Sequence, residues 1–288
     1  MTSAAGSTRP SAARRPLARV AVLTHGRTEQ IGAGLVRLQS VAREAGVELL
    51  VPPEEAEKHG LPAAGDLARA DIAVVLGGDG TMLRALARFL GTGVPVLGVN
   101  FGRVGFLSSM GRAGLETGLA RVFAGEYEVV ELPTIEVEAA GARFVAVNDT
   151  VATSGQLGRM VELQWAVGGE DLGSVPCDGI ICSTPSGSTA YNLSNGGPVL
   201  MWGLDAMALT FAAPHSLHAR PLVVPRGRDV LVWNRTSDVS VAVLVDGHHV
   251  ADAPPAARVV MRLGPERTLL ATLPEATFVS RYRQSFAT

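Results

Sequence analysis

The segment Gly77-Gly78-Asp79-Gly80-Thr81 places one carboxylate among three glycines. It follows the apolar run 72–76 and precedes residues with helical spacing, so we expect it to join a buried strand to a helix that begins near Thr81. Glycines let a backbone approach a phosphate closely, and the amides at a helix start attract anions. A carboxylate repels phosphate, so Asp79 is expected to take a proton from a hydroxyl nucleophile or to hold a divalent cation. A simple Asp-Gly turn with Thr81 as the helix cap is the alternative.

A second glycine-bearing segment, Asn100–Leu107, follows the next predicted strand, 94–99. The carboxyl ends of parallel strands lie along one edge of a sheet, where ligands bind. We therefore expect this segment and the turn at Asp79 to face the same crevice.

The stretch from Asp178 to Pro198 is the densest in small polar side chains. Its residues 179–182 are predicted to form a buried strand, and hydroxyl, glycine and amide residues follow as far as Tyr191. Such donors and acceptors suit ribose, phosphate and amide groups, and Tyr191 is expected to stack on a base or close a pocket wall. A polar surface loop is the alternative, but a loop of this length between apolar runs usually has a function.

The pair Asn148-Asp149 interrupts an apolar run. An amide beside a carboxylate at a strand end is suited to ribose hydroxyls or to an adenine edge. A turn explains the pair equally well.

Lys58 is the only lysine, and arginine supplies every other positive side chain. P-loop enzymes and protein kinases need a lysine in a glycine-rich loop or on a strand, which Lys58 does not provide. The segment Gly32-Ala33-Gly34 lies in a predicted helix and lacks the third glycine of the dinucleotide fingerprint. A hydrolase built on Ser186 and His215 is disfavoured because no Gly-x-Ser-x-Gly elbow is present. Phosphate charge would therefore be neutralised by a divalent metal, backbone amides and arginines, which predicts strict metal dependence.

The composition bounds the class of protein. A chain of 288 residues favours two domains, and its net charge of −2 does not favour a nucleic-acid partner. No apolar run is long enough to span a membrane. Cys177 and Cys182 lack metal-type spacing, which favours a reducing cytoplasm. The Ala-, Ser- and Arg-rich residues 1–17 are predicted to be a disordered tail, with a transit-like leader as the alternative.

The texture of the chain changes near residue 125. Short apolar strands alternate with helical stretches over 18–125, which predicts an α/β domain with a parallel sheet. The Pro- and Glu-rich residues between the apolar runs 47–51 and 71–76 are assigned to a loop. Residues 126–273 contain many short strands and few helical patterns, which predicts an all-β, sandwich-like domain.

Together these motifs resemble the NAD kinase family. Gly77–Thr81 is similar to its GGDGT turn, Asn100–Leu107 to its N-x-G-x-x-G-F-L segment, and Asn148-Asp149 to its Asn-Glu pair. Asp178–Pro198 resembles the family's long D-G-x-x-x-S-T-P-T-G-S-T-A-Y…G-G-P block, and Pro214–Leu222 its P-H-x-L-x-x-R-P-L segment. GGDGT alone is shared with lipid kinases.

The resemblance implies a kinase that phosphorylates NAD on the 2′-hydroxyl of its adenosine ribose, with ATP or polyphosphate as donor and Mg²⁺ or Mn²⁺ as cofactor. It implies that residues 274–288 return to the N-terminal domain, that NAD lies between the domains, and that the chain forms a homotetramer. Asp79 would be the general base, the metal ligands stay unknown, and Asp178 would reach NAD across a subunit interface. The implied NAD-binding residues are Asp79, Gly80, Arg84, Asn148, Asp149, Arg159, Asp178, Thr189, Ala190, Tyr191, Asn192 and Ser194.

The chain departs from the family pattern at three places. Asp149 replaces Glu and is one methylene shorter, so its ribose contact is expected to shift or to pass through water. Ser186 replaces Thr, and His248 and His249 follow Asp246-Gly247 where the family often has Gln. The histidine pair is expected to lie in an exposed turn, with pH sensing or metal binding as alternatives. A lipid or sugar kinase and a non-enzymatic NAD-binding regulator remain the rival functions.

Overall fold

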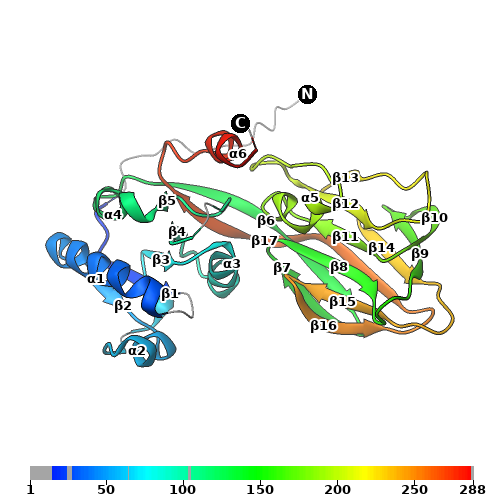
Figure 1. Cartoon of the computed structure of the whole chain (residues 1–288), viewed down its shortest axis with the longest axis horizontal. Coiled ribbons are helices and arrows are strands. Elements are labelled where there is room, and N and C mark those ends of the chain that lie inside the picture. The colour runs from blue at the N-terminus through cyan, green and yellow to red at the C-terminus, as the bar shows by residue number, and fades with distance from the viewer. Residues whose placement is uncertain (1–14, 25–27, 64, 103–104, 287–288) are drawn as a thin grey trace. The chain divides into compact units, whose positions relative to one another are not determined.

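The computed structural model describes residues 15–24, 28–63, 65–102 and 105–286 (Figure 1). The chain forms two compact units: unit 1 contains Met1–Glu131 and Thr268–Thr288, and unit 2 contains Leu132–Arg267. The domain limits predicted from the sequence, near residues 125 and 273, lie a few residues from these. Most of the predicted tail lies outside the described residues. Leu17 is described, and it is buried with its amide donating to the carbonyl of Phe123, so the tail prediction is wrong at that residue.

Unit 1 is built on a parallel sheet with the strand order β2-β1-β3-β4. Beyond β4, the sheet continues with β5 and with the end of β17, whose residues Leu270 and Ala271 pair with Val96 and Leu97. The strands of this unit are β1 (Arg19–Thr24), β2 (Glu48–Leu50), β3 (Ile72–Leu76), β4 (Val96–Asn100), β5 (Met110–Gly111) and the last part of β17 (Arg258–Thr272).

Helices connect these strands, as parallel pairing requires. They are α1 (Thr28–Ala45), α2 (Pro53–His59), α3 (Asp79–Arg88), α4 (Leu115–Phe123) and the C-terminal α6 (Phe278–Phe286), with the short 3₁₀ turns η1 (Leu67–Arg69) and η2 (Arg112–Gly114). In α4, the residues Leu115, Leu119 and Val122 recur at helical spacing and are buried in one core with β1, β3 and α1. The predicted α/β fold of this part of the chain is confirmed.

Two boundaries differ from the prediction. The Pro- and Glu-rich residues assigned to a loop form α2, which has Pro53 in its first turn and Gly60 as a left-handed C-cap at φ 64°. The helix after the glycine turn begins at Asp79, with Gly78 as its extended N-cap residue, so Thr81 lies within the helix and does not cap it.

Unit 2 is a β-sandwich. One sheet has the order β13-β12-β11-β8-β15-β16, and the other contains β10-β9-β14-β17 with β6 beside β17 and β7 beside β6. Their bounds are β6 (Glu128–Ala139), β7 (Ala142–Ala146), β8 (Asp149–Ser154), β9 (Val161–Val167), β10 (Glu170–Cys177), β11 (Gly179–Ser183), β12 (Ala206–Ala212), β13 (Leu222–Pro225), β14 (Val230–Asn234), β15 (Val241–Val245) and β16 (His248–Ala253).

The two sheets of unit 2 enclose one apolar core. Trp165 on β9 meets Phe211 on β12 edge to face, with ring centroids 5.3 Å apart. Alternate residues of β14 and β15 point into this core, which gives the period-two burial seen in the sequence. The predicted all-β character of this region is confirmed. Among the described residues, no helix is both long and apolar enough to cross a membrane.

Candidate active site

The glycine turn of unit 1 joins the fully buried strand β3 to α3, with Asp79 as the first helical residue. Gly77 must be glycine, because a Cβ there would lie 2.7 Å from Oγ1 of Thr81. Gly78 and Gly80 instead have nothing within 4 Å of that position, so the backbone at both residues borders open space. The Thr81 hydroxyl is buried and has no hydrogen-bond partner among the described residues.

Two backbone amides hold the carboxylate of Asp79. Phe106 N donates to Oδ2 at 2.7 Å, and Leu107 N donates to Oδ1 at 3.2 Å. A Cβ on Gly105 would overlap both carboxylate oxygens, so the loop can approach only because residue 105 is glycine. The two predicted glycine loops therefore meet within unit 1, with Asp79 as the link. Each oxygen still has acceptor capacity left.

Arg84 is the basic residue predicted on this side of unit 1. It is exposed on α3, four residues after the exposed Gly80, so the two lie on the same face of the helix. A guanidinium at this place is free to meet an anion at the start of the helix. Residues 103–104 of the second loop, which were part of the predicted motif, lie outside the described residues.

In unit 2, the pair Asn148-Asp149 lies at the start of β8, and its backbone is hydrogen-bonded to the carboxylate of Asp246. The carboxylate of Asp246 accepts backbone amides from Val147 at 2.9 Å, Asn148 at 2.7 Å and Asp149 at 3.2 Å. Asp246 has φ 49° in the turn between β15 and β16, a left-handed conformation that aspartate tolerates better than most residues. The sequence singled out Asp246 only as the neighbour of the histidine pair, and its role as a clamp was missed.

Asp149 is buried, with 7 % of its surface exposed. Burial, and then the negative charge of Asp246, raise the pKa of Asp149 to about 6. Burial also raises the pKa of Asp246, although its three backbone donors oppose the shift. The carboxyl that stands in place of the family's Glu therefore titrates close to neutral pH.

The polar stretch after β11 divides into a buried framework and an exposed edge. Thr184, Ser186 and Ser188 are buried, and their hydroxyls donate to backbone carbonyls, among them that of Val147. A Cβ on Gly187 would overlap the backbone of Asn148, which makes this glycine a packing requirement. The hydroxyls expected to serve as ligand donors are thus largely used in shaping the loop.

Asn192 also belongs to this framework. It is fully buried, its amide donates to the carbonyls of Ser188 and Pro198, and its Oδ1 accepts from the Thr210 hydroxyl at 2.7 Å. Because these bonds use the side chain, the predicted contact of Asn192 with NAD stays a prediction without support from the geometry. The outer edge, formed by the turn η3 (Gly187–Thr189) and the short helix α5 (Tyr191–Ser194), carries the half-buried or exposed residues Thr189, Ala190, Tyr191 and Ser194.

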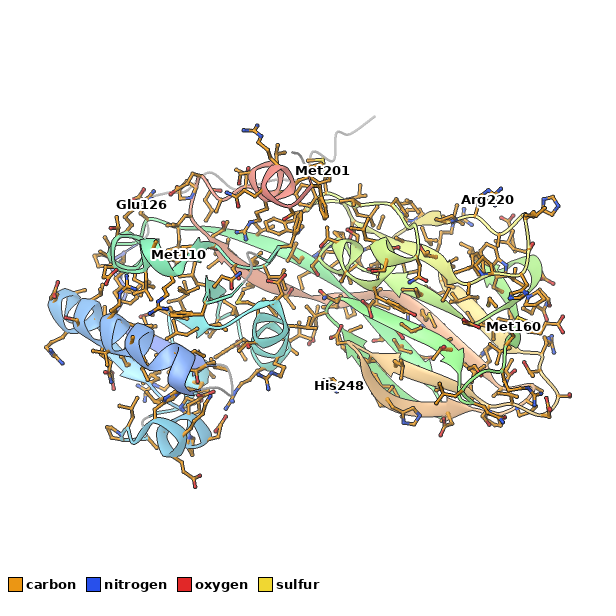
Figure 2. All side chains as sticks on the ribbon, in the orientation of Figure 1. Met110, Glu126, Met160, Met201, Arg220 and His248 are labelled. Atoms are coloured by element: carbon orange, nitrogen blue, oxygen red, sulfur yellow. The ribbon has the colours of Figure 1, made fainter. Side chains whose placement is uncertain are left out.

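Asp178 and Arg159 lie at the other end of the same sheet. Strands β8 and β11 are antiparallel, with Gly179 opposite Thr153 and Ser183 opposite Asp149, so Asp178 is about 17 Å along the sheet from Asp149. Arg159 follows β8 and pairs with Asp238 at 2.7 Å. Figure 2 shows Met160, the next residue, and His248, beside the Asp246 turn, at opposite ends of unit 2. Within one chain, unit 2 therefore does not bring Asp178 and Arg159 to Asn148 and Asp149.

His248 and His249 are exposed at the start of β16, and His249 pairs with Asp252 at 3.0 Å. The exposure agrees with the prediction, although the residues begin a strand and follow the turn. In the part of the chain that the structure describes, no three His, Cys, Asp or Glu side chains are grouped as metal ligands.

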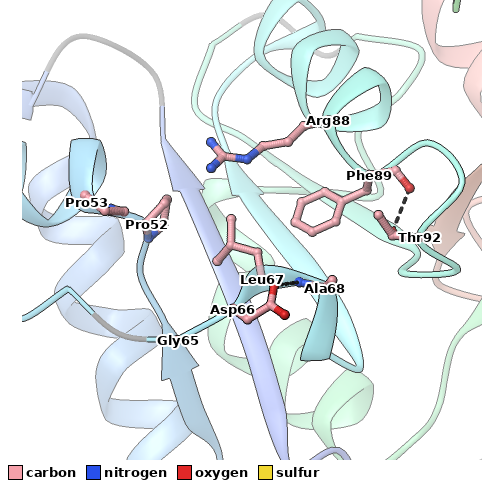
Figure 3. Close-up of a pocket in the computed structure, with 9 residues that line it drawn as sticks. All are labelled: Pro52, Pro53, Gly65, Asp66, Leu67, Ala68, Arg88, Phe89 and Thr92. Carbon is pink, nitrogen blue, oxygen red and sulfur yellow. Dashed lines mark hydrogen bonds between the residues drawn. The ribbon is translucent and has the colours of Figure 1, made fainter.

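A pocket in unit 1 is separate from these residues (Figure 3). Arg88 is one of the residues that line it and is paired with Glu54 on α2. Its lining consists of Pro52, Pro53, Gly65, Asp66, Leu67, Ala68, Arg88, Phe89 and Thr92. None of the predicted site residues is among them.

Family models match both parts of the chain. Residues 52–127 match the ATP-NAD kinase N-terminal domain, and residues 147–273 match the ATP-NAD kinase C-terminal domain. The chain belongs to the NAD kinase family. It is 38 % identical to the NAD kinase of Gemmatimonas aurantiaca over 74 % of this chain and 76 % of the relative. With the NAD kinase of Leifsonia xyli it shares 37 % identity over 89 % of this chain and 86 % of the relative.

Two solved structures show the same fold. The yeast NADH kinase complexed with NADH has a TM-score of 0.82 at 23 % identity and covers 94 % of this chain and 88 % of its own. The Archaeoglobus fulgidus NAD kinase in complex with ATP has a TM-score of 0.73 at 23 % identity and covers 92 % of this chain and 99 % of its own. The resemblance stated from the motifs is therefore confirmed at the level of family and fold.

Proposed function

We propose that this NAD kinase family member transfers the γ-phosphoryl group of ATP to the 2′-hydroxyl of the adenosine ribose of NAD, and that Asp79 is the general base. The observation that carries the assignment of Asp79 is its carboxylate, fixed by the amides of Phe106 and Leu107 at the start of α3. Members of this family convert NAD to NADP, so the proposed acceptor is the ribose 2′-hydroxyl that this conversion phosphorylates.

In the proposed step, the 2′-oxygen attacks the γ-phosphorus, the bond from that phosphorus to the β,γ-bridging oxygen breaks, and ADP leaves with the bond's electrons. The hydroxyl proton passes to the carboxylate of Asp79. Phosphoryl transfer needs little covalent help, so fixing the acceptor and stabilising charge account for most of the rate. A carboxylate locked by two backbone donors does not have to reorient during the reaction.

A divalent cation, Mg²⁺ or Mn²⁺, fits this donor set. Mg²⁺ in kinases is held by one or two carboxylates together with phosphate oxygens and water. Asp79 offers a half-buried carboxylate with unused lone pairs, and the buried hydroxyl of Thr81, two residues along the helix, has no partner among the described residues. When bound, the cation would neutralise charge on the phosphates, with Arg84 and the amides of the helix start adding to it.

The acceptor contacts are proposed in two groups. Asn148 and Asp149, held by Asp246, would bind ribose hydroxyls, and Tyr191 would offer an exposed ring for stacking. Thr189, Ala190 and Ser194 would complete the exposed edge beside it. Asn192 would act on NAD only through the loop that its buried amide holds together.

We further propose a homotetramer in the cytoplasm. Asp178 and Arg159 lie at the far end of the β8–β11 pair from Asp149, so a role for them at the same NAD is better met by a second chain. Cys177 and Cys182 are buried free thiols, which suits a reducing compartment. Light scattering of the purified protein tests the tetramer. Mixing Asp79→Asn with Asp178→Asn chains tests the shared site, since recovered activity requires residues from different chains.

The decisive experiment measures NADP formed from NAD and ATP with Mg²⁺, beside NADH as acceptor and polyphosphate as donor. Asp79→Asn is expected to lower kcat by about 10²–10⁴-fold with little change in NAD binding by calorimetry. Glu44→Gln, an exposed carboxylate on α1, is the matched control and should leave kcat unchanged. Unchanged turnover in Asp79→Asn would remove its role as base, and activity that survives excess EDTA would remove the metal.

A further inference from the structure

The loop 106–109 orients the carboxylate of Asp79, and a buried arginine of the C-terminal helix α6 is bonded to that loop. Arg281 on α6 is 3 % exposed, in a unit whose other arginines are exposed or half-buried wherever they are described. Burying a guanidinium is strongly unfavourable unless its donors are satisfied. The buried guanidinium of Arg281 therefore requires hydrogen-bond acceptors around it.

Arg281 has as many hydrogen-bond acceptors around it as it has N–H donors. Nε donates to Ala276 O at 3.0 Å, Nη1 donates to Phe106 O at 3.0 Å and also to Ser108 O, and Nη2 donates to Thr272 Oγ1 at 2.9 Å and to Ser109 Oγ at 3.3 Å. An arginine has five N–H donors, and these five acceptors are neutral oxygens. Three of them belong to the loop 106–109.

Phe106 is the shared residue. Its amide donates to Asp79, its carbonyl accepts from Arg281, and its ring packs against Phe278 and Phe286 on α6 with centroids 5.5 and 5.7 Å apart. The peptide unit between Phe106 and Leu107 donates its N–H to Asp79 and accepts from Arg281 through its carbonyl, so rotation of this unit would break bonds to both residues. The preceding unit, whose N–H also donates to Asp79, is anchored by the Phe106 ring against α6.

We propose that Arg281 is a positioning residue for phosphoryl transfer, acting on Asp79 through the loop 106–109. This inference rests on the proposed role of Asp79 as general base. Burial lowers the pKa of Arg281 to about 10, and the nearby carboxylate of Asp79 opposes that shift. The guanidinium consequently stays charged throughout the neutral range, and its grip on the loop does not depend on pH there.

The test compares Arg281→Gln with Arg283→Gln, an exposed arginine on the same helix. Arg281→Gln is expected to lower kcat about 10- to 10³-fold while KM for NAD and the calorimetric NAD affinity change less than about threefold, because the loss lies in orientation. Arg283→Gln should match the wild type in all three. An unchanged kcat, or NAD affinity lost in parallel with kcat, would overturn the proposal.

A double-mutant cycle separates this route from a general effect on the fold. If Arg281 acts through Asp79, Arg281→Gln adds less than about twofold to the loss already caused by Asp79→Asn. Losses that multiply would show that Arg281 acts elsewhere. If Asp79→Asn itself retains turnover, the proposed role of Asp79 as general base fails whatever Arg281 does, so the two failures are distinct.

The conservative variant and chemical rescue complete the design. An ammonium cannot present the planar fork that reaches Phe106 O and Ser108 O together, so Arg281→Lys should recover the charge and only part of kcat. Guanidinium ion at millimolar concentration should raise kcat of Arg281→Ala at least threefold above sodium chloride of equal ionic strength. If Arg281→Gln does not fold, Arg281→Lys decides the matter: wild-type kcat overturns the proposal, and a fall of at least fivefold with intact NAD affinity supports it.

Discussion

Gly105 lies so close to the carboxylate of Asp79 that no larger residue fits between them. The closeness lets Phe106 and Leu107 present their amides to the same carboxylate. A small residue in one loop is therefore a condition for the orientation of an acidic residue in another.

Gly105→Ala is expected to lower kcat about 10²-fold, because the added methyl displaces the Asp79 carboxylate or the loop. NAD affinity should change little, since unit 2 keeps its residues. Steady-state kinetics and calorimetry measure the two effects. Gly32→Ala, in α1 with nothing within 4 Å of the added Cβ, is the control and should be as active as the wild type. Full activity in Gly105→Ala would show that the carboxylate position is not limiting.

Gly80→Ala tests whether a ligand approaches the helix start. The free protein has room for a methyl at residue 80, so the free energy of unfolding should stay within about 0.5 kcal/mol of the wild type. If phosphates lie against this backbone, KM for ATP should rise at least tenfold. Urea unfolding and initial-rate kinetics provide both values, and an unchanged KM would place the phosphates elsewhere.

Asp149→Asn is expected to stabilise the protein at pH 7.5. The pKa of Asp149 rises from 3.8 unfolded to about 6 folded, so the folded state binds its proton more tightly and loses stability as the pH rises through that window. The neutral amide should add about 1–3 kcal/mol to the free energy of unfolding at pH 7.5 and less at pH 5. Urea unfolding at both pH values measures this. Equal gains, or the same gains in the exposed control Asp252→Asn, would contradict it.

The same carboxyl should show the opposite effect on binding. Below about pH 6 it is protonated and is a poorer acceptor for ribose hydroxyls, so NAD affinity should weaken as the pH falls. In Asp149→Asn that pH dependence should disappear while affinity at pH 7.5 drops. Calorimetric titrations between pH 5 and 8 separate the two contributions.

Asn192 and Ser194 should respond in opposite ways. Asn192→Ala leaves Thr210 and two carbonyls without partners in a buried place and should cost about 2–4 kcal/mol of stability. Ser194→Ala, at an exposed residue, should change stability by less than about 0.5 kcal/mol and weaken NAD binding instead. Thermal unfolding and calorimetry on both variants decide between framework and contact. The assignment fails if Ser194→Ala is the destabilised one.

Much of the fold was readable because it depends on local patterns. The fully apolar β3 and the period-two strands β14 and β15 are patterns of burial that neighbouring residues alone determine. Helix α2 was missed although Pro53, Glu54 and Gly60 stand where helix starts and ends favour them, since the proline density was taken as a sign of a loop. Helix α3 starts at Asp79, earlier than expected, with Gly78 as its extended N-cap residue and Asp79 as an acidic residue of the first turn, where the helix dipole favours it.

Only part of the candidate site could be predicted from the sequence, and the reason is physical. Residue type and spacing identify motif residues such as Asp79 and Tyr191. For a hydroxyl in the same stretch, the sequence does not indicate whether it faces a ligand or a backbone carbonyl. Ser186 and Asn192 proved to be bonded inward. Asp246 and Arg281 act on partners about a hundred residues or more away, which no local pattern reveals.

Unit 1 is assembled from both ends of the chain, since Thr268–Thr288 join Met1–Glu131. On the ribosome, the stretch that supplies Arg281 emerges only after all of unit 2 has been made. The glycine turn is therefore synthesised early but receives the contacts of Arg281 late. A message cut short just before residue 278 would yield a polypeptide with every signature motif and without the helix that keeps its carboxylate in place.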